Sequence, residues 1–271
     1  MKFKNIAALF SSALIAVALV ACGGGAGSTN SQGDANSGKK TYVIASDNGF
    51  APFEIANADG TYTGIDMDLM DAIAKDQGFS YEMQNVGFKM AVSSLEAGQV
   101  DGVIAGMSIT DERREMFDFS DPYYDSTVCC AALADSEINS LEDLKGKNVA
   151  VKDGTMSQSW AESIKDQYGF TTTTFKDSPK MYQEVGGNSV ACFEDTPVMA
   201  YSIKQYKATD GKEGVNLKII GEVSPDDQYA SQYGFAVKKG QNAELLDKFN
   251  AGLANLKKSG KYDEIVNKYL K

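Results

Sequence analysis

The stretch GIDMDLMDAIAKDQG, residues 64–78, predicts an amphipathic helix packed on a hydrophobic core. Its apolar side chains recur every three to four residues and therefore form one stripe. The residues of this stripe are Met67, Met70, Ile73 and Ala74. Gly78 is a helix stop signal, so we expect the helix to span residues 66–77.

Short β-rich runs alternate with amphipathic helical stretches on both sides of this helix. The expected strands are residues 41–46, 81–86, 102–106, 148–152, 171–175 and 189–193. The other expected helices are residues 89–97, 157–167, 179–185, 197–207, 243–258 and 262–270. This alternation is typical of α/β units over a mainly parallel sheet, and the number of strands favours two α/β lobes.

The composition of the 271 residues is that of a folded globular protein, with 43% hydrophobic and 23% charged residues. Lys and Arg total 26 against 37 Asp and Glu, a net charge of −11, which disfavours binding to nucleic acid. The chain contains no histidine, which excludes imidazole bases, serine–histidine triads and histidine-ligated metal sites. We expect no metal and no cofactor.

The N-terminal segment has the features of an export signal. As a helix, the apolar run from Ile6 to Val20 is about 22 Å long, shorter than the membrane core of about 30 Å. The tetrapeptide LVAC that ends at Cys22 resembles a bacterial lipobox, in which the cysteine is lipidated. We expect a signal peptide over 1–21, a flexible Gly/Ser tether over 22–40, and a lipid anchor that holds the protein to the membrane outside the cytoplasm. The alternative is a plain signal peptide with an incidental cysteine.

Three further cysteines lie in apolar runs. Cys129 and Cys130 are adjacent and would point to opposite faces of a strand, and Cys192 follows in the run VACFE. We expect buried free thiols, and a disulfide between Cys192 and one of the pair is the alternative.

The GIDMDL motif before an apolar helix resembles the signature of the extracellular solute-binding proteins, family 3, which are polar-amino-acid receptors of ABC importers. Gln77 departs from it, because an apolar or small residue is usual there. Further segments agree in order and spacing. They are APFE (51–54), AGMSITDER (105–113), DFSDPYY (118–124), LEDLKGK (141–147), VKDGT (151–155), EDTP (194–197), QYGF (232–235) and the terminal GKYDEIVNKYL. The resemblance covers residues 41–271.

The resemblance implies a type II periplasmic-binding fold, in which two α/β lobes joined by two crossover strands close over a ligand like a Venus flytrap. It implies a first lobe from residues 41–124 and 223–271, and a second from 128–219. We expect a monomer whose partners are a free amino acid and the membrane subunits of an ABC permease.

The resemblance also implies roles at the two ends of an amino acid. Arg113 would clamp the α-carboxylate, because a planar guanidinium offers two parallel donors that lysine lacks. Ala105, Ser108 and Thr155 would add polar contacts, the last at a positive helix end. Asp195 would bind the α-ammonium. The alternatives are a surface Arg113 paired with a neighbouring glutamate, and an Asp195 that caps the next helix.

Six residues would surround the ligand side chain. By resemblance, Phe50 and Phe88 sandwich it, and Asp47 and Lys152 bracket a carboxamide as in glutamine-binding members. Met156 and Glu194 depart from those members, which carry glycine and histidine there. Glu194 could neutralise Lys152 and leave room for a cationic ligand.

These patterns favour a lipoprotein that captures a polar amino acid, with glutamine preferred, and delivers it to a permease. The first alternative is an arginine, lysine or histidine receptor of the same type. More remote alternatives are a dehydratase-like enzyme, for which Glu194 or Lys152 would be the acid or base, and a sensory receptor. We expect no enzymatic activity.

Overall fold

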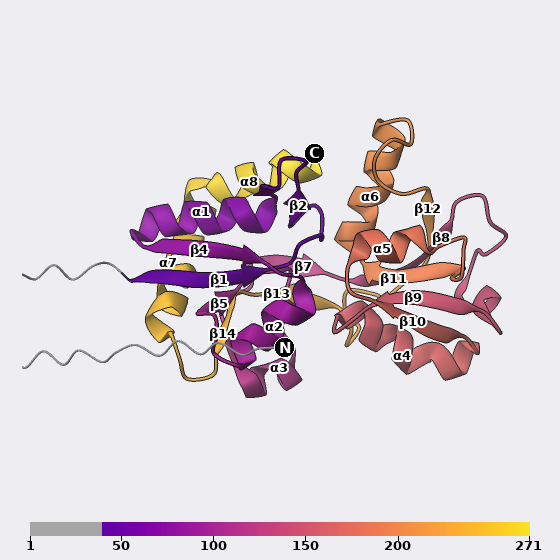
Figure 1. Cartoon of the computed structure of the whole chain (residues 1–271), viewed down its shortest axis with the longest axis horizontal. Helices are drawn as coiled ribbons and strands as arrows, with labels where there is room; N and C mark the ends of the chain where they lie inside the picture. Colours follow the sequence, from indigo (N-terminus) through magenta and orange to yellow (C-terminus); the bar gives the residue numbers. More distant parts are fainter. Residues whose placement is uncertain (1–39) are drawn as a thin grey trace, which may run out of the picture. The chain divides into compact units, whose positions relative to one another are not determined.

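The computed structural model describes residues 40–271 (Figure 1). The predicted signal peptide, Cys22 and all of the tether except Lys40 lie outside these residues, so their assignments stay predictions. Over the described range, no helix combines the length and the apolar character that a membrane crossing requires.

The first sheet has the strand order β4-β1-β5-β14-β6. Its strands are β1 (Thr41–Ser46), β4 (Ser80–Asn85), β5 (Gly102–Val103), β6 (Phe117–Phe119) and β14 (Ala236–Lys238). Strand β1 runs parallel to β4 and β5, whereas β14 runs antiparallel to β5 and β6. Segments far apart in the chain therefore build one sheet.

Helices cover both faces of this sheet (Figure 1). They are α1 (Ile65–Gln77), α2 (Phe88–Glu96), α3 (Asp111–Met116), α7 (Ala243–Ser259) and α8 (Lys261–Leu270). Alternation along β1 places Ile44 in the core under α1 and α7, and Ala45 in the core under α2. The predicted stripe of α1 is buried, as expected from its spacing.

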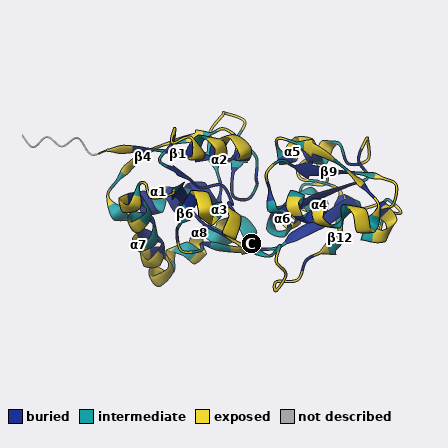
Figure 2. Cartoon of the chain, turned by 90° about the horizontal axis from the view of Figure 1, so that it is seen from below, coloured by how far each residue is buried: buried dark blue, intermediate teal, exposed yellow. Residues whose placement is uncertain are grey.

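The second sheet has the strand order β10-β9-β11-β8-β12. Its strands are β8 (Val128–Leu133), β9 (Asn148–Lys152), β10 (Thr171–Phe175), β11 (Ala191–Asp195) and β12 (Leu217–Glu222). They pack with η1 (Leu141–Leu144), α4 (Met156–Tyr168), α5 (Ser178–Gln183) and α6 (Thr196–Ala208). The central strands β8, β9 and β11 are buried, whereas the outer strands β10 and β12 are partly exposed. The helices that pack on this sheet have exposed outer sides (Figure 2).

In each sheet four of the five strands run in the same direction, as expected for mainly parallel sheets, and one strand, β14 or β8, runs against them. Strands β9, β10 and β11 are parallel, but β8 runs antiparallel to β11 and β12. The antiparallel strands are those by which the chain enters or leaves a sheet, so no crossover helix sets their direction. The prediction of two sheet-containing α/β lobes is confirmed.

Two paired strands lie where the chain passes between the sheets. Strand β7 (Tyr124–Ser126) precedes the second sheet, and β13 (Ser231–Tyr233) follows it and pairs with β7 in antiparallel fashion. A small hairpin of β2 (Ile55–Ala56) and β3 (Tyr62–Thr63) precedes α1. The lobe boundaries expected at 124, 128, 219 and 223 stay predictions.

The cysteines of the second sheet are buried free thiols, as predicted. Cys129 and Cys192 pack in the core that contains Met181, and Cys130 packs in the core that contains Trp160. Burial raises the pKa of all three thiols, which makes them poor nucleophiles.

Candidate functional site

The candidate site lies at the carboxyl ends of strands from both sheets, where the chain turns and polar side chains meet. One cavity is lined by every predicted ligand contact except Glu194, and by Gly106. These residues are Asp47, Phe50, Phe88, Ala105, Gly106, Ser108, Arg113, Lys152, Thr155, Met156 and Asp195. The cavity has a volume of about 10 Å³, room for about one water molecule, because the side chains of the two lobes pack against one another.

Arg113 faces this cavity, and its neighbour Arg114 is exposed to solvent. Arg113 Nη1 donates to the Ser108 carbonyl at 2.7 Å, and Arg113 Nη2 donates to the Gly154 carbonyl at 2.9 Å. The guanidinium lies 5.3 Å from the centre of the Phe88 ring. Burial lowers the pKa of Arg113 to about 10, against the attraction of Asp195. Arg113 therefore stays charged at neutral pH and is oriented toward the cavity.

Thr155 begins helix α4 at the edge of the cavity. Its hydroxyl accepts from the Gln158 N–H at 3.2 Å and donates to the Lys152 carbonyl at 2.8 Å. The hydroxyl thus acts as a helix cap, and Thr155 lines the cavity, so its role as a ligand contact stays a prediction. The first amides of α4 retain the partial positive charge of a helix N-terminus.

Asp195 ends strand β11 and is buried. Its Oδ2 accepts from the Tyr233 hydroxyl at 2.6 Å, whereas its Oδ1 accepts no hydrogen bond from any group in residues 40–271. Its side chain does not cap α6, so the capping alternative fails. Burial and the nearby Glu194 raise the pKa of Asp195 to about 7. Asp195 thus presents an unused acceptor in the cavity.

Asp47 and Lys152 form an ion pair across the cavity, and each side chain is only 1% exposed. Asp47 follows the end of β1, and Lys152 ends β9, so the pair joins the two lobes. Burial lowers the pKa of Lys152, but the attraction of Asp47 and Glu194 outweighs it, and the net shift is upward. Lys152 therefore remains charged.

The two aromatic residues, Phe50 and Phe88, are buried and each lies beside a cation. Lys152 Nζ is 4.6 Å from the centre of the Phe50 ring, and Arg113 lies beside Phe88. Such contacts stabilise a desolvated cation by about 2 kcal/mol. The aromatic walls therefore support the charged groups of the cavity.

Glu194 is placed differently from the prediction, because it does not line the cavity. Its carboxylate accepts from the Ser178 hydroxyl at 2.6 Å, the Tyr182 hydroxyl at 3.0 Å and the Asp195 N–H at 3.0 Å. Successive strand residues point to opposite faces, so Glu194 and Asp195 cannot both face the cavity. Burial raises the pKa of Glu194, despite the attraction of Lys152.

Sequence reasoning missed two residues of the site. Gly106 has φ 53°, and an added Cβ would lie 2.4 Å from the Phe50 ring, so only glycine fits there. Tyr233 holds Asp195 through its hydroxyl. Both residues belong to segments that matched the family pattern, AGMSITDER and QYGF, so the signal was present without a role attached.

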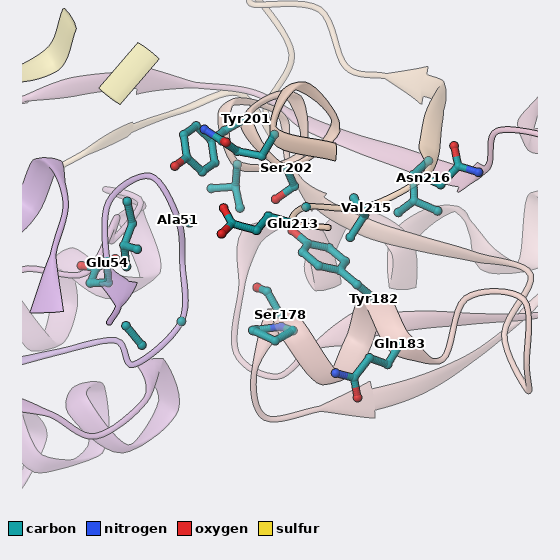
Figure 3. A pocket seen from close by; sticks show the side chains of 18 of the residues that line it. Ala51, Glu54, Ser178, Tyr182, Gln183, Tyr201, Ser202, Glu213, Val215 and Asn216 are labelled. Carbon is teal, nitrogen blue, oxygen red and sulfur yellow. The ribbon is translucent and has the colours of Figure 1, made fainter. Parts of the chain in front are cut away.

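A second, larger cavity of about 560 Å³ is lined by residues of both lobes (Figure 3). Ser178 and Tyr182, which hold Glu194, line it together with Glu54 and residues of the second lobe. In the described part of the chain, no cluster of three or more acidic or cysteine side chains is arranged to hold a metal ion.

Comparison with known proteins gives one consistent result. The family model of the bacterial extracellular solute-binding proteins, family 3, matches residues 42–271. The arginine-binding extracellular protein ArtP of Bacillus subtilis (strain 168) is 32% identical over 263 residues, which are 96% of each chain.

Solved structures extend this similarity. The second substrate-binding domain of a putative amino acid ABC transporter from Streptococcus pneumoniae is 46% identical, with a TM-score of 0.58, over 85% of this chain and 100% of that chain. An ancestral arginine-binding protein bound to arginine is 35% identical, with a TM-score of 0.75, over 85% and 98% of the two chains. A structure of an ancestral arginine-binding protein bound to glutamine is 34% identical, with a TM-score of 0.74, over 84% and 97%.

Proposed function

Because the chain belongs to the bacterial extracellular solute-binding proteins, family 3, we propose that it captures a free polar amino acid and delivers it to an ABC permease. The observation that carries this proposal is the pair Arg113 and Asp195. They come from different lobes and line one cavity.

The pair matches the two charged ends of an amino acid. A guanidinium has five N–H donors, and Arg113 uses two on backbone carbonyls, so donors remain for an α-carboxylate beside the N-terminus of α4. The unused Oδ1 of Asp195 is an acceptor for an α-ammonium. An affinity near 1 μM needs about −8 kcal/mol, which these charged hydrogen bonds and aromatic contacts can supply.

The charge of the cavity favours glutamine as the ligand. Its lining contains two cations, Arg113 and Lys152, and two acids, Asp47 and Asp195. A zwitterion with a neutral side chain preserves this balance, whereas a charged side chain adds an uncompensated charge in a buried site. Lys152 can donate to a carboxamide oxygen, and Asp47 can accept from its NH₂.

The position of Glu194 supports the same preference. A cationic ligand would need an additional acid at the side-chain end, and Glu194 was the candidate. Its carboxylate is occupied by Ser178, Tyr182 and the Asp195 N–H, and it lies outside the cavity lining.

Capture requires the lobes to separate and close again, because an amino acid does not fit in about 10 Å³. A ligand that contacts both lobes stabilises the closed arrangement by its differential affinity for it. The permease would then distinguish the closed form from the open form.

A receptor for arginine, lysine or histidine is the second candidate. Relatives named as arginine-binding favour it. An enzyme or a sensory receptor on the same fold has no comparable support in the site, so we propose that the chain is not an enzyme.

A thermal-shift panel of the twenty amino acids tests the proposal. We expect glutamine to raise Tm most. A larger shift with arginine, lysine or histidine would select the second candidate, and no shift with any amino acid would refute amino-acid capture.

We further propose that the protein acts outside the cytoplasm as a lipid-anchored monomer. The lipobox-like sequence before Cys22 supports the anchor. Replacement of Cys22 by alanine is expected to release the protein from the membrane fraction, as measured by immunoblot. Retention of the variant in the membrane fraction would contradict the lipid anchor.

A further inference from the structure

Glu54 and Asp66 form a buried pair of acids beside the candidate site. Glu54 lies before strand β2, and Asp66 lies in the first turn of α1. Both side chains are fully buried, and the two carboxyl groups lie close enough to shift one another's pKa. Neither residue lines the cavity of the candidate site, and neither is a predicted ligand contact.

If both acids are ionised, the surrounding groups offer too few hydrogen-bond donors for the four carboxylate oxygens. A carboxylate only accepts hydrogen bonds. Glu54 Oε2 and Asp66 Oδ1 receive no hydrogen bond from any N–H or O–H group between residues 40 and 271. Ser46 Oγ lies 2.8 Å from Glu54 Oε1 and 2.5 Å from the Ile104 carbonyl oxygen. Because the hydroxyl has a single hydrogen, it can donate fully to only one of these two acceptors. At least one added proton is needed to link these oxygens.

We propose that Glu54 and Asp66 share a proton at neutral pH, and that the protonated pair holds the cavity segment Ala105–Ser108 in place through Gly106. The proton supplies the donor that two buried carboxyl groups in contact otherwise lack. The pair thus acts as a positioning element for ligand binding, and its effect on affinity rests on the proposed function.

A short chain of contacts connects the pair to the ligand groups. Asp66 Oδ2 accepts from the Gly106 N–H at 2.9 Å and from the Tyr123 hydroxyl at 2.8 Å. Gly106 lines the cavity against the Phe50 ring. Two residues later, the Ser108 carbonyl accepts from Arg113. A shift of Asp66 would therefore displace the backbone that orients Arg113.

The charges that surround the pair favour its protonated form. Burial raises the pKa of Asp66 to about 6 and the pKa of Glu54 well above its ordinary value. Asp47, after β1, repels both carboxylates, and Lys152 on β9 attracts Glu54. The remaining titratable neighbours are the neutral phenols of Tyr123 and of Tyr262 on α8.

The sign of the pH dependence follows from these upward shifts. A group whose pKa is higher in the folded state stabilises the fold at low pH, and this stability is lost as the pH rises through the folded value. Because the two acids interact, the pair loses its protons in two steps. The first loss lies near 6, and the second follows at a higher pH, because burial raises the pKa of Glu54 well above its ordinary value.

Infrared spectroscopy of the full chain tests the proton directly. At about pH 8, acids with ordinary pKa values are ionised, so we expect a carbonyl band of a protonated carboxylic acid that is lost in Glu54→Gln. Asp101→Asn is the control, because hydrogen bonds from Lys40 and the Val43 N–H keep the pKa of Asp101 low, and the band should persist. A spectrum without a band that depends on Glu54 would overturn the shared proton.

Calorimetry with glutamine tests the positioning role. Glu54→Gln replaces the proton with an amide N–H, so its Kd should stay within about threefold of the original at neutral pH. Glu54→Ala leaves Asp66 Oδ1 without a donor and should raise Kd by about tenfold or more. If Glu54→Ala does not fold, Asp66→Asn offers the complementary amide and should bind as Glu54→Gln does.

Calorimetry at alkaline pH distinguishes deprotonation of the Glu54–Asp66 pair from deprotonation of the ligand. Between about pH 8 and 10 the ligand ammonium loses its proton in every variant. The original chain should lose more affinity over this range than Glu54→Gln, whose hydrogen does not titrate. Equal losses would overturn the positioning role. If no variant binds glutamine while the infrared band depends on Glu54, the proposed ligand fails and the shared proton stands.

Discussion

The Arg113 guanidinium contacts both lobes through two backbone carbonyls, that of Ser108 in the first lobe and that of Gly154 in the second. The orientation of the Arg113 side chain therefore depends on both lobes being in place around it. Arg114 points to solvent from the same short helix, so sequence neighbours have different environments.

Arg113→Ala is expected to raise the Kd for glutamine at least about tenfold, because a charged hydrogen bond contributes about 1.5–3 kcal/mol. Arg113→Lys should also weaken binding, since an ammonium cannot reproduce the planar fork. Calorimetry measures both variants, with Arg114→Ala as the exposed control. Unchanged affinity in Arg113→Ala would remove Arg113 from the site.

The titration of Asp195 is expected to weaken ligand binding at low pH, whereas that of the Glu54–Asp66 pair is expected to weaken it at high pH. Its pKa is raised to about 7, so the fold alone is less stable as the pH rises through this value. The ligand α-ammonium binds to Asp195 only when this carboxyl group is ionised. Affinity should therefore fall about tenfold per pH unit below about 7. Calorimetry from pH 5 to 8 should show this slope in the original chain and its loss in Asp195→Asn.

At the scale of the element, strand β11 assigns different roles to two adjacent acids. Glu194 faces Ser178 and Tyr182, and Asp195 faces Arg113 and Tyr233, because a strand alternates its side chains. The segment that contains Gly106 shows a second constraint of this kind, since it passes so close to Phe50 that no side chain fits.

Gly106→Ala is expected to lower Tm and weaken ligand binding. The left-handed conformation costs about 1 kcal/mol, and the contact of the new Cβ with Phe50 adds about 1–3 kcal/mol. Gly60→Ala is the matched control, because Gly60 has φ 84° and open space around it. Thermal denaturation should show a clearly larger loss in Gly106→Ala, and equal losses would contradict the close packing against Phe50.

At the scale of the whole described chain, both hydrogen bonds and ion pairs join the lobes. Besides the buried Asp47–Lys152 pair, Lys89 on α2 contacts Asp153 at the end of β9, with Nζ 2.5 Å from the carboxylate. Lys89 is 65% exposed, so water and salt screen this pair.

Lys89→Ala should raise the Kd for glutamine by less than about fivefold, since an exposed ion pair contributes at most about 1 kcal/mol. The effect should shrink at high salt. Lys165→Ala, which breaks a pair with Glu162 inside α4, leaves the lobe contacts intact and should not change Kd. Calorimetry at low and high salt measures both. An equal effect of the two variants would mean that Lys89 does not act through closure.

The sequence alone determined the fold class, and it predicted most of the residues that line the candidate cavity. The apolar stripe of α1 and the strand 41–46 follow from periodicity, which short-range sterics and burial impose on any amphipathic element. Arg113, Lys152 and Asp195 were predicted by resemblance because they lie in recognisable segments.

Tertiary structure decided which of these groups face one another. Glu194 turns away from the cavity, Tyr233 reaches Asp195 from a distant strand, and Glu54 meets Asp66. Each of these facts depends on contacts between segments that are remote in the chain. Local patterns encode the face that a side chain occupies within its own element, but burial, charge and proton sharing arise only when elements pack together.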